Sequence, residues 1–521
     1  MRSVGTVLFL VVLATLVATG ARRWRIPAPS LLVVAGLFVA LLPGAPEIHI
    51  TPEIIGLVVL PPLLYASAEE LSWRELRAVW KPVSVLAVGL VLASAAVVGF
   101  VASALTPLSW QMALVLGAVL ASTDPVAVTA LGRRLALPPR VQVMVQAESL
   151  FNDATSLVLF RVAVSVAIAS SAVSWGSAGS EFALLAGGGT LIGAAIAGVV
   201  MLIRRRIEDP VLETVVALVT PYAAYVLAET AHTSGVTSVV VAGVLVGGSG
   251  DRLTSARIRL QLHAVYGTVV FLLESVVFSL IGLSLPGLIR ELGDENRLWP
   301  VYALALAGTV ITVRVLWIFP LSALLQGKNG KAKTNWRIPA VLSWAGTRGV
   351  MPLAAALSIP IAAADGSPLA QRPLVLVLTS SVVVVTLVVQ GFTLAAVVRR
   401  SGIGLEPDHT EREEVGARLS LAEAGLRRLD ELSGLEAAPE AVLDRLRRAL
   451  QARRDHAHDR LGDDEGPYES ADQVYRHLRR DLINVEAAEL RRLYDDHHIS
   501  DTTRRQLQRT LDLEEARLSD L

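Results

Sequence analysis

Long apolar blocks, repeated along the first 400 residues, limit what this chain can fold into more than any other feature of its sequence. Each block runs for about 17–25 residues, which is the length of helix that crosses a bilayer. A backbone surrounded by lipid must satisfy its own hydrogen bonds, so helices are expected here. Only 18% of the residues are charged, whereas soluble proteins contain roughly a quarter. The sequence therefore predicts an all-α polytopic membrane protein.

About thirteen transmembrane helices can be placed along residues 1–400, and the second and ninth of them are short. Each is located from the middle of an apolar block. Their approximate centres are Val12, Ala35, Val59, Leu90, Val119, Ala154, Ile192, Val219, Val241, Leu273, Ala307, Ala345 and Val385.

Basic residues occur in alternate connectors between these spans, and loops rich in Lys and Arg face the cytoplasm. This alternation predicts an N-terminus outside the cell and a cytoplasmic C-terminal end. Arg290, Arg297 and Arg372 are exceptions on the other side. A cleaved signal peptide at the first span is an alternative, but its three following arginines would then have to be exported. The basic connectors contain Arg22, Arg23, Arg25; Arg74, Arg77, Lys81; Arg133, Arg134, Arg140; Arg204, Arg205, Arg206; Arg252, Arg257, Arg259; and Lys328, Lys331, Lys333, Arg337.

Residues 401–521 differ in composition from the rest of the chain. They hold 19 Lys and Arg against 28 Asp and Glu, whereas residues 1–400 hold 28 and 19, which together give the 47 of each in the whole chain. Apolar residues recur at helical spacing from Val415 to Leu432. We therefore expect a transmembrane domain over 1–400 and a soluble helical tail over 401–521, with a regulatory role. Six histidines in the tail could sense pH.

Two of the predicted spans carry a charged residue beside helix-breaking residues. Asp124 precedes Pro125 in span five, and Arg348 lies between Gly346 and Gly349 in span twelve. Proline removes an amide donor and interrupts a helix. Because the two spans are an odd number apart, they run in opposite directions, as in transporters built from inverted repeats. Two ordinary proline kinks are the alternative. Arg348 is well placed to offset the partial charge of a half-helix end.

A polar strip interrupts span six at Glu148-Ser149-Leu150-Phe151-Asn152-Asp153. Ser149 and Asp153 are four residues apart and share one face of the helix, and Glu148 and Asn152 form the adjacent strip. These groups offer oxygen ligands for a hard monovalent cation, to which backbone carbonyls at Thr123 could add. The alternative is a satisfied polar pair between helices, and for Glu148 we favour that interpretation, with Arg314 as its partner.

A buried carboxylate at Asp153 would have a direct use in transport. A carboxyl group in a poorly hydrated cavity holds a proton more readily than one in water. It can then bind either H+ or a cation, and this competition gives exchange if the carrier moves only when one of them is bound. Ionisable residues inside membrane helices are candidates for such sites by default.

Together, Thr123-Asp124-Pro125-Val126, the Glu148–Asp153 motif and Gly346-Thr347-Arg348-Gly349 resemble the cation:proton antiporter-1 family of NhaP/NHE-type Na+/H+ exchangers. The resemblance covers residues 5–400. It implies a thirteen-helix NhaA/NhaP-like fold, a homodimer and a core domain that moves against a dimerisation domain. It also implies a protein of the cell membrane that serves pH homeostasis.

The same resemblance assigns roles to individual residues. Asp153 would bind the transported Na+ and H+, with Ser149 and the Thr123 backbone as further Na+ ligands and Asp124 nearby. Asn152 would be the neutral member of an Asn-Asp pair, which implies electroneutral 1:1 exchange. The remaining implied roles are a core ion pair between Glu148 and Arg314 and charge compensation at the second broken helix by Arg348.

The sequence departs from this family in span three. Many members carry an acidic residue after the aromatic residue of a Pro-Leu-Leu-Phe/Tyr motif, but here Ala66 follows Tyr65. A further cation ligand is therefore missing, and selectivity among Na+, Li+ and K+ stays open, with K+/H+ exchange as the first alternative.

Other classes of function fit the sequence less well. A channel would need a filter or a charged ring, and none is visible. An intramembrane aspartyl protease could pair Asp124 with Asp153, but the Gly-x-Gly-Asp context is absent. A receptor would use the tail, which has no nucleotide-binding motif. The chain lacks cysteine, which excludes thiol chemistry. We expect no enzyme activity, no cofactor, no nucleic acid partner, and the bilayer as the main partner; the tail's own partner stays open.

Overall fold

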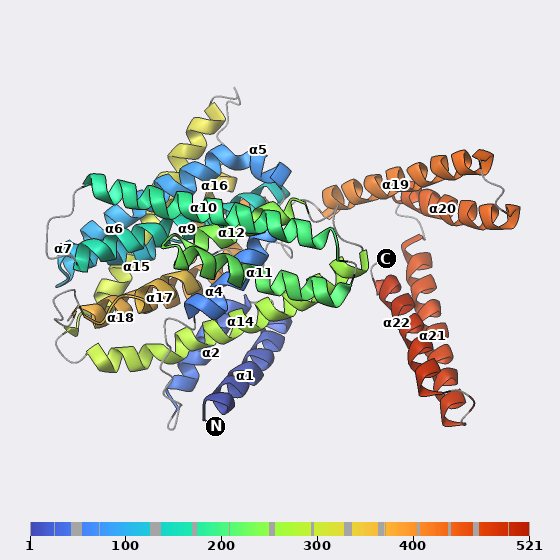
Figure 1. The fold of residues 1–521 in the computed structure, drawn as a ribbon, viewed down its shortest axis with the longest axis horizontal. Helices are drawn as coiled ribbons and strands as arrows, with labels where there is room; N and C mark the ends of the chain where they lie inside the picture. The colour runs from blue at the N-terminus through green and yellow to red at the C-terminus, as the bar shows by residue number, and fades with distance from the viewer. Residues whose placement is uncertain are drawn as a thin grey trace. The chain divides into compact units, whose positions relative to one another are not determined.

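The computed structural model describes residues 2–24, 27–42, 55–71, 73–124, 137–168, 175–207, 209–249, 256–292, 296–327, 336–362, 369, 371–403, 407–435, 439–461, 468–496, 498 and 500–519. The chain forms two compact units, Met1–Glu406 and Pro407–Leu521. The regular elements of the described ranges are helical (Figure 1).

Among the described residues of the first unit, thirteen helical segments can serve as membrane passes. Seven are long and apolar enough to cross a membrane, and five shorter apolar helices accompany them. The interrupted pair α16 and α17 makes the thirteenth. Twelve of the predicted span centres lie within these helical segments, and the remaining one, Ala345, lies at the interruption between α16 and α17, so the thirteen-helix membrane fold is confirmed. The elements are α1 (Arg2–Trp24), α2 (Ala28–Ala40), η1 (Ile55–Val59) with α4 (Leu60–Glu69), α5 (Trp73–Ser84) with η2 (Val85–Leu90) and α6 (Val91–Leu105), α7 (Trp110–Leu120), α9 (Pro139–Ile168), α10 (Trp175–Arg204), α11 (Pro210–Thr230), α12 (Gly235–Gly247), α14 (Ala256–Leu292), α15 (Trp299–Gly327), α16 (Arg337–Trp344), α17 (Val350–Leu357) and α18 (Arg372–Ser401).

Two passes contain π-helical turns that the apolar pattern does not predict. The segment η2 follows Pro82 within the fourth pass, and η1 precedes Pro61 and Pro62 in the third. Proline cannot donate its backbone hydrogen bond and clashes with the preceding turn. At η1, a wider i→i+5 turn on the side that precedes the prolines relieves this local misfit while the helix continues.

Small residues let neighbouring helices approach closely. A side chain at Gly36 of α2 would collide with the Ser279 carbonyl of α14, and one at Gly282 of α14 would collide with the Val33 carbonyl. The same arrangement joins α6 and α7, where Gly117 lies against the Ala95 carbonyl. Close contact through small residues is the usual way in which membrane helices gain van der Waals packing.

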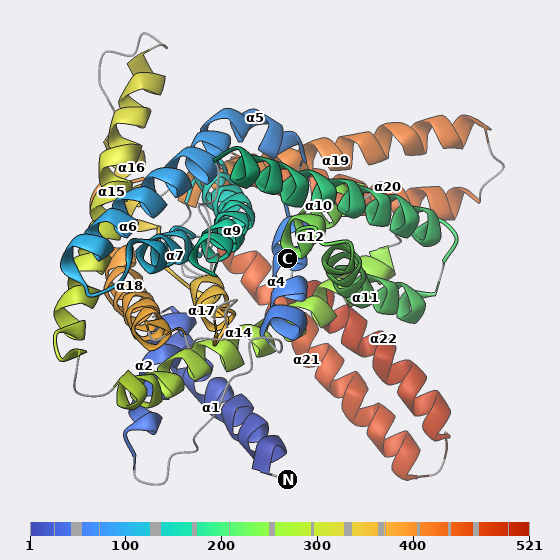
Figure 2. The same cartoon turned by 60° about the vertical axis from the view of Figure 1, so that its left-hand side comes forward.

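The helices that carry the polar motifs lie next to one another. Figure 2 shows α9 beside α7, α10 and α12, with α17 and α18 close to α7. The first half of span five, α7, ends at Leu120, and Ser122, Thr123 and Asp124 follow without helical structure. Pro125, the predicted cause of this break, lies outside the described residues. Span twelve is interrupted at residues 345–349, between α16 and α17. Both breaks therefore leave backbone groups without their usual helical partners.

The described part of the second unit forms four helices that pack as two hairpins. Figure 1 shows α19 (Pro407–Leu435) beside α20 (Glu440–Leu461), and α21 (Tyr468–Asp495) beside α22 (Asp501–Ser519). Arg447 of α20 pairs with Asp430 of α19 at 3.0 Å, and Arg479 of α21 pairs with Glu514 of α22. Salt bridges between the two helices of a hairpin therefore accompany the packing in both cases.

Candidate ion-binding site

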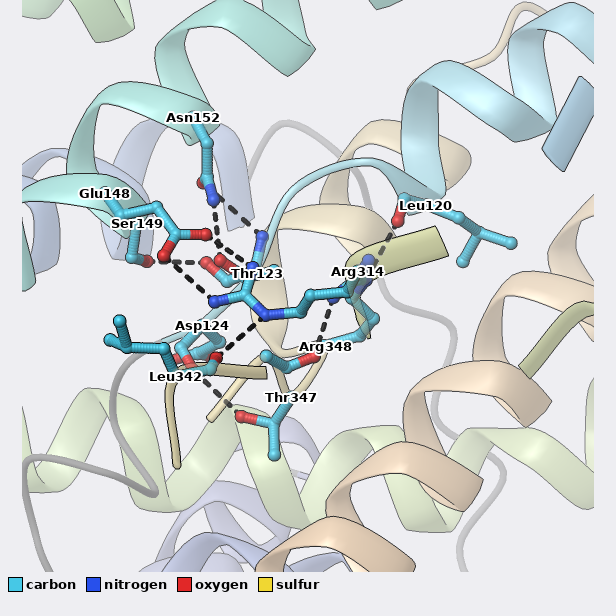
Figure 3. A network of polar contacts seen from close by, with 11 residues as sticks. Leu120, Thr123, Asp124, Glu148, Ser149, Asn152, Arg314, Leu342, Thr347 and Arg348 are labelled. Atoms are coloured by element: carbon cyan, nitrogen blue, oxygen red, sulfur yellow. Dashed lines mark hydrogen bonds and ion pairs between the residues drawn. The ribbon is translucent and has the colours of Figure 1, made fainter. Parts of the chain in front are cut away.

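The two interrupted spans meet at Asp124 and Thr347, which lie far apart in the sequence. The Asp124 amide donates to the Thr347 carbonyl at 2.8 Å, and the Thr347 hydroxyl donates to the Asp124 carbonyl at 2.8 Å (Figure 3). A side chain at Gly349 would collide with the Asp124 carboxylate. Hydrogen bonds between the two non-helical segments therefore satisfy backbone groups that would otherwise remain unpaired.

Side chains of span six form hydrogen bonds with Thr123, which lies at the break in span five. The Ser149 hydroxyl donates to the Thr123 carbonyl at 2.5 Å, and the Asn152 amide donates to the Thr123 hydroxyl at 2.6 Å. The Thr123 amide donates in turn to the Asn152 side-chain oxygen at 3.4 Å. Figure 3 shows both α9 side chains directed at Thr123. The predicted strip on α9 and the Thr123 backbone are thus brought together.

Asp153 lies in the same buried region but has a different environment. Its side chain is 6% exposed, and its Oδ1 atom makes no hydrogen bond to the part of the chain that the structure describes. Its carboxylate lies close to Ser122, Asp124 and Arg348. A buried polar atom without a partner is uncommon in native proteins and calls for an explanation such as an ion or a water.

Arg348 caps the broken end of α7. Its Nε atom donates to the carbonyl of Leu120, the last residue of α7, at 2.9 Å, and Nη1 donates to the Gly346 carbonyl at 2.6 Å. The side chain is 1% exposed. The final carbonyls of a helix carry partial negative charge and lack helical partners. A guanidinium at this position supplies both the hydrogen bond and the compensating charge.

Arg314 caps the end of α16 and also forms an ion pair with Glu148. Its guanidinium donates to both Glu148 oxygens, at 2.5 and 2.9 Å, and its Nε donates to the Leu342 carbonyl at 3.1 Å. Both partners are at most 2% exposed. Gly346 lies against the guanidinium, where a larger side chain would collide with it. The Glu148 charge is therefore compensated, whereas that of Asp153 is not paired in this way.

A second buried cluster of charges was not predicted from the sequence. Arg204 at the end of α10 lies 3.5 Å from Glu69 of α4 and 3.8 Å from Glu213 of α11. Its place in a run of three arginines indicated only a basic connector. Glu213 is fully buried, because α11 packs against both α10 and α4. The positions of these residues near predicted span ends gave no signal of this burial.

Arg161, two turns beyond Asp153, belongs to neither cluster. It forms an ion pair with Glu229 of α11 and donates to the Thr233 carbonyl at 3.4 Å. Both members of the pair are about one third exposed, at 37% and 32%. The pair lies in the wall of a cavity of about 720 Å³ together with Phe160. Its contacts join α9 to the end of α11 and to the connection between α11 and α12.

Known proteins of similar sequence are sodium/hydrogen exchangers. The family described as "Sodium/hydrogen exchanger, transmembrane" matches residues 8–400. An uncharacterised Na+/H+ exchanger of Mycobacterium tuberculosis is 33% identical over 99% of this chain and 97% of its own length. The Na+/H+ antiporter ApNhaP of Aphanothece halophytica is 32% identical over 85% of this chain and 84% of its own length.

A similar fold is known from a solved structure. The sodium proton antiporter MjNhaP1 from Methanocaldococcus jannaschii superposes with a TM-score of 0.61 at 21% identity, covering 78% of this chain and 98% of that one. The matched family and relatives are transporters, which supports the expectation that this chain is no enzyme. With the family match over most of its length, the whole-chain likeness to the mycobacterial protein and the antiporter fold, this multi-pass membrane protein belongs to the sodium/hydrogen exchanger family.

Proposed function

We propose that this antiporter exchanges Na+ for H+ at Asp153, where the two ions compete for one buried carboxylate. The observation that carries the proposal is the unpartnered Oδ1 atom of Asp153 among the residues that the structure describes. The neighbouring polar groups are already engaged: Glu148 with Arg314, and Asn152 with Thr123. Asp153 is thus the acidic side chain of the strip that is left able to bind an ion.

Further oxygen ligands for Na+ lie next to Asp153. The Thr123 carbonyl accepts one hydrogen bond from Ser149, and a carbonyl oxygen has a second lone pair. The Ser149 oxygen can also donate its lone pairs to a cation while its proton stays directed at Thr123. Asp124 would contribute negative charge near the ion. Na+ is then the substrate, held by Asp153, Ser149 and Thr123.

Neutral Asn152 beside Asp153 favours electroneutral 1:1 exchange. One carboxylate that carries either a proton or a monovalent cation has the same net charge in both loaded states. With Ala66 in place of an acidic residue, no additional carboxylate from that position of α4 takes part. K+ is the alternative substrate, because a relative from Bacillus subtilis is named a sodium, potassium, lithium and rubidium/H+ antiporter.

Cation-driven proton flux in proteoliposomes tests this function. Na+, Li+ and K+ are added separately outside vesicles that hold a pH-sensitive dye. We expect Na+ and Li+ to drive H+ movement and an imposed membrane potential to leave the rate unchanged. Flux with K+ alone would replace Na+ by K+ as the substrate, and a rate that follows the potential would exclude electroneutral exchange. No flux with any of the three cations would contradict antiport.

We further propose that the tail over 401–521 is regulatory. The protein would be a homodimer of the cell membrane, with its N-terminus outside and its tail in the cytoplasm. The helices of the tail form a unit distinct from the one that carries the candidate site. Ending the chain after Gly402 is expected to preserve flux and to shift its dependence on pH. The check is the pH profile of the shortened protein against that of the full chain. Identical profiles, in a protein that remains monodisperse, would contradict a regulatory role.

A further inference from the structure

A cleft of about 700 Å³ lies beside the helix that carries the candidate site, on a face that ion binding does not use. One wall is formed by α5 and η2, and the opposite wall by α9 and α10, with Thr237 of α12. Its size is within the range of small-molecule sites, about 300–1,000 Å³.

The first wall is a single stripe along one helical face. Trp73, Arg77, Trp80, Ser84 and Val88 follow one another at intervals of three or four residues, so they share one side of the helix. They line the cleft and are exposed. The buried residues Leu76 and Val83 also line the cleft, so the stripe forms the exposed part of this wall and these apolar residues lie deeper in it.

The chemistry of the stripe changes along its length. Its first half combines cationic and aromatic side chains, because Arg77 lies between Trp73 and Trp80, which are 55% and 54% exposed. Tryptophan is enriched at the level of lipid headgroups. Further along, Val88 on one wall faces a second wall that is mostly apolar. That wall contains Phe151, Ala154, Thr155 and Val158 of α9, and Phe182 and Ala186 of α10.

Arg77 is the charged residue among those that line the cleft. Arg77 has no ion-pair partner within the described ranges. Arg74 and Lys81 lie on the same helix, which contains a single acidic residue, Glu75. Lys81 lies over the Trp80 ring at 6.0 Å. An arginine that lies between two tryptophans along one helical face is suited to a phosphate group at the membrane interface.

We propose that this cleft binds an anionic phospholipid, with its phosphate at Arg77 and one acyl chain along Val88 and Phe151. The order of groups along the cleft matches that of a phospholipid. A cation and aromatic rings lie at the end for the headgroup, and apolar walls lie beyond for the acyl chain. An anionic lipid surface attracts such basic residues. A soluble anion would use only the first half of the cleft, whereas a phospholipid fills both.

A bound lipid would lie against the helix that holds Asp153. Phe151 and Ala154 line the cleft, and Asn152 and Asp153 stand between them in sequence on α9. Occupancy of the cleft is therefore expected to alter the rate of exchange. This consequence rests on the proposed function, whereas lipid binding itself does not.

Native mass spectrometry of the full-length protein in detergent tests the binding. The protein is titrated with phosphatidylglycerol or phosphatidylcholine that carry the same acyl chains. We expect the first phosphatidylglycerol to bind about fivefold more tightly, the contribution of one arginine near a membrane surface. Arg77→Gln should remove this preference. Arg74→Gln is the matched control, since Arg74 is on the same helix but does not line the cleft, and should retain it.

A second variant tests the apolar half of the cleft. Val88→Trp should weaken binding of both lipids, because the larger side chain fills the space beside Phe151. If that variant fails to fold, Ala186→Leu narrows the cleft from the α10 wall instead. Unchanged phosphatidylglycerol binding in Arg77→Gln and in the filled variant would overturn the proposal. Equal binding of the two lipids by the wild type, or a wild type that binds neither lipid, would do so as well. Because binding is read from mass, these results are independent of whether the chain transports Na+.

Discussion

Asp153→Asn is expected to abolish cation-driven proton flux. The variant keeps the size of the side chain but removes the group that exchanges a proton for a cation. Asp153 is buried and one of its oxygens has no partner among the described residues, so the amide is not expected to unfold the protein. The measurement is flux in proteoliposomes at several pH values, since loss at one pH could reflect only a shifted pH optimum.

Glu291→Gln is a matched control for this experiment. It makes the same chemical change at an exposed carboxylate near the end of α14, and its flux should equal that of the wild type. If Asp153→Asn retained flux at any pH while Glu291→Gln behaved normally, the proton would have to be carried elsewhere. Asp124 would then be the next candidate, because it lies close to Asp153.

Glu148→Gln is expected to destabilise the protein strongly. It leaves the Arg314 guanidinium buried without its counter-charge, and breaking such a pair by removing one partner lowers the free energy of unfolding by about 3–5 kcal/mol. The hydrogen bond from Arg314 to the Leu342 carbonyl would remain, so the end of α16 should stay capped. The midpoint of thermal unfolding in detergent measures the effect.

A second ion pair of the same unit supplies the comparison. Glu229→Gln makes the same change in the pair with Arg161, which is about one third exposed. Pairs with access to solvent contribute at most about 1 kcal/mol, so the loss should be several times smaller. The double change Glu148→Gln with Arg314→Gln should restore part of the stability lost by Glu148→Gln. Equal losses for Glu148→Gln and Glu229→Gln would show that burial does not set the strength of the first pair.

Much of the fold could be predicted from the sequence because the signals are local. Apolar blocks predicted the passes, and the glycines around Arg348 together with Pro125 predicted two interrupted spans. The third and fourth passes contain π-helical turns that a block of apolar residues does not reveal, since it looks the same in an α-helix and a π-helix. Hydropathy determines where a pass lies and says little about its hydrogen-bond pattern.

The candidate site could be predicted in part. The spacing on α9 placed Ser149 and Asn152 on adjacent strips, and the structure shows both bound to Thr123. The pairing of Asp124 with Thr347 could not be predicted, because it joins residues that only the crossing of two spans brings together. Burial of Glu213 beside Arg204 depends likewise on the packing of several helices. Contacts of this kind have no local signal in a single sequence.

The arginine caps have a thermodynamic consequence for ligand binding. Arg348 and Arg314 satisfy the ends of α7 and α16 with groups of the chain itself, so the assembly of the site does not depend on a cation. The site is then already folded when a cation binds. The rise in unfolding temperature caused by the cation should therefore report its affinity alone. At a concentration 100 times the dissociation constant, this stabilisation would be about 2.7 kcal/mol. Thermal shifts with Na+, Li+ and K+ should therefore rank the three ions by affinity, even in a protein that has never been placed in a membrane.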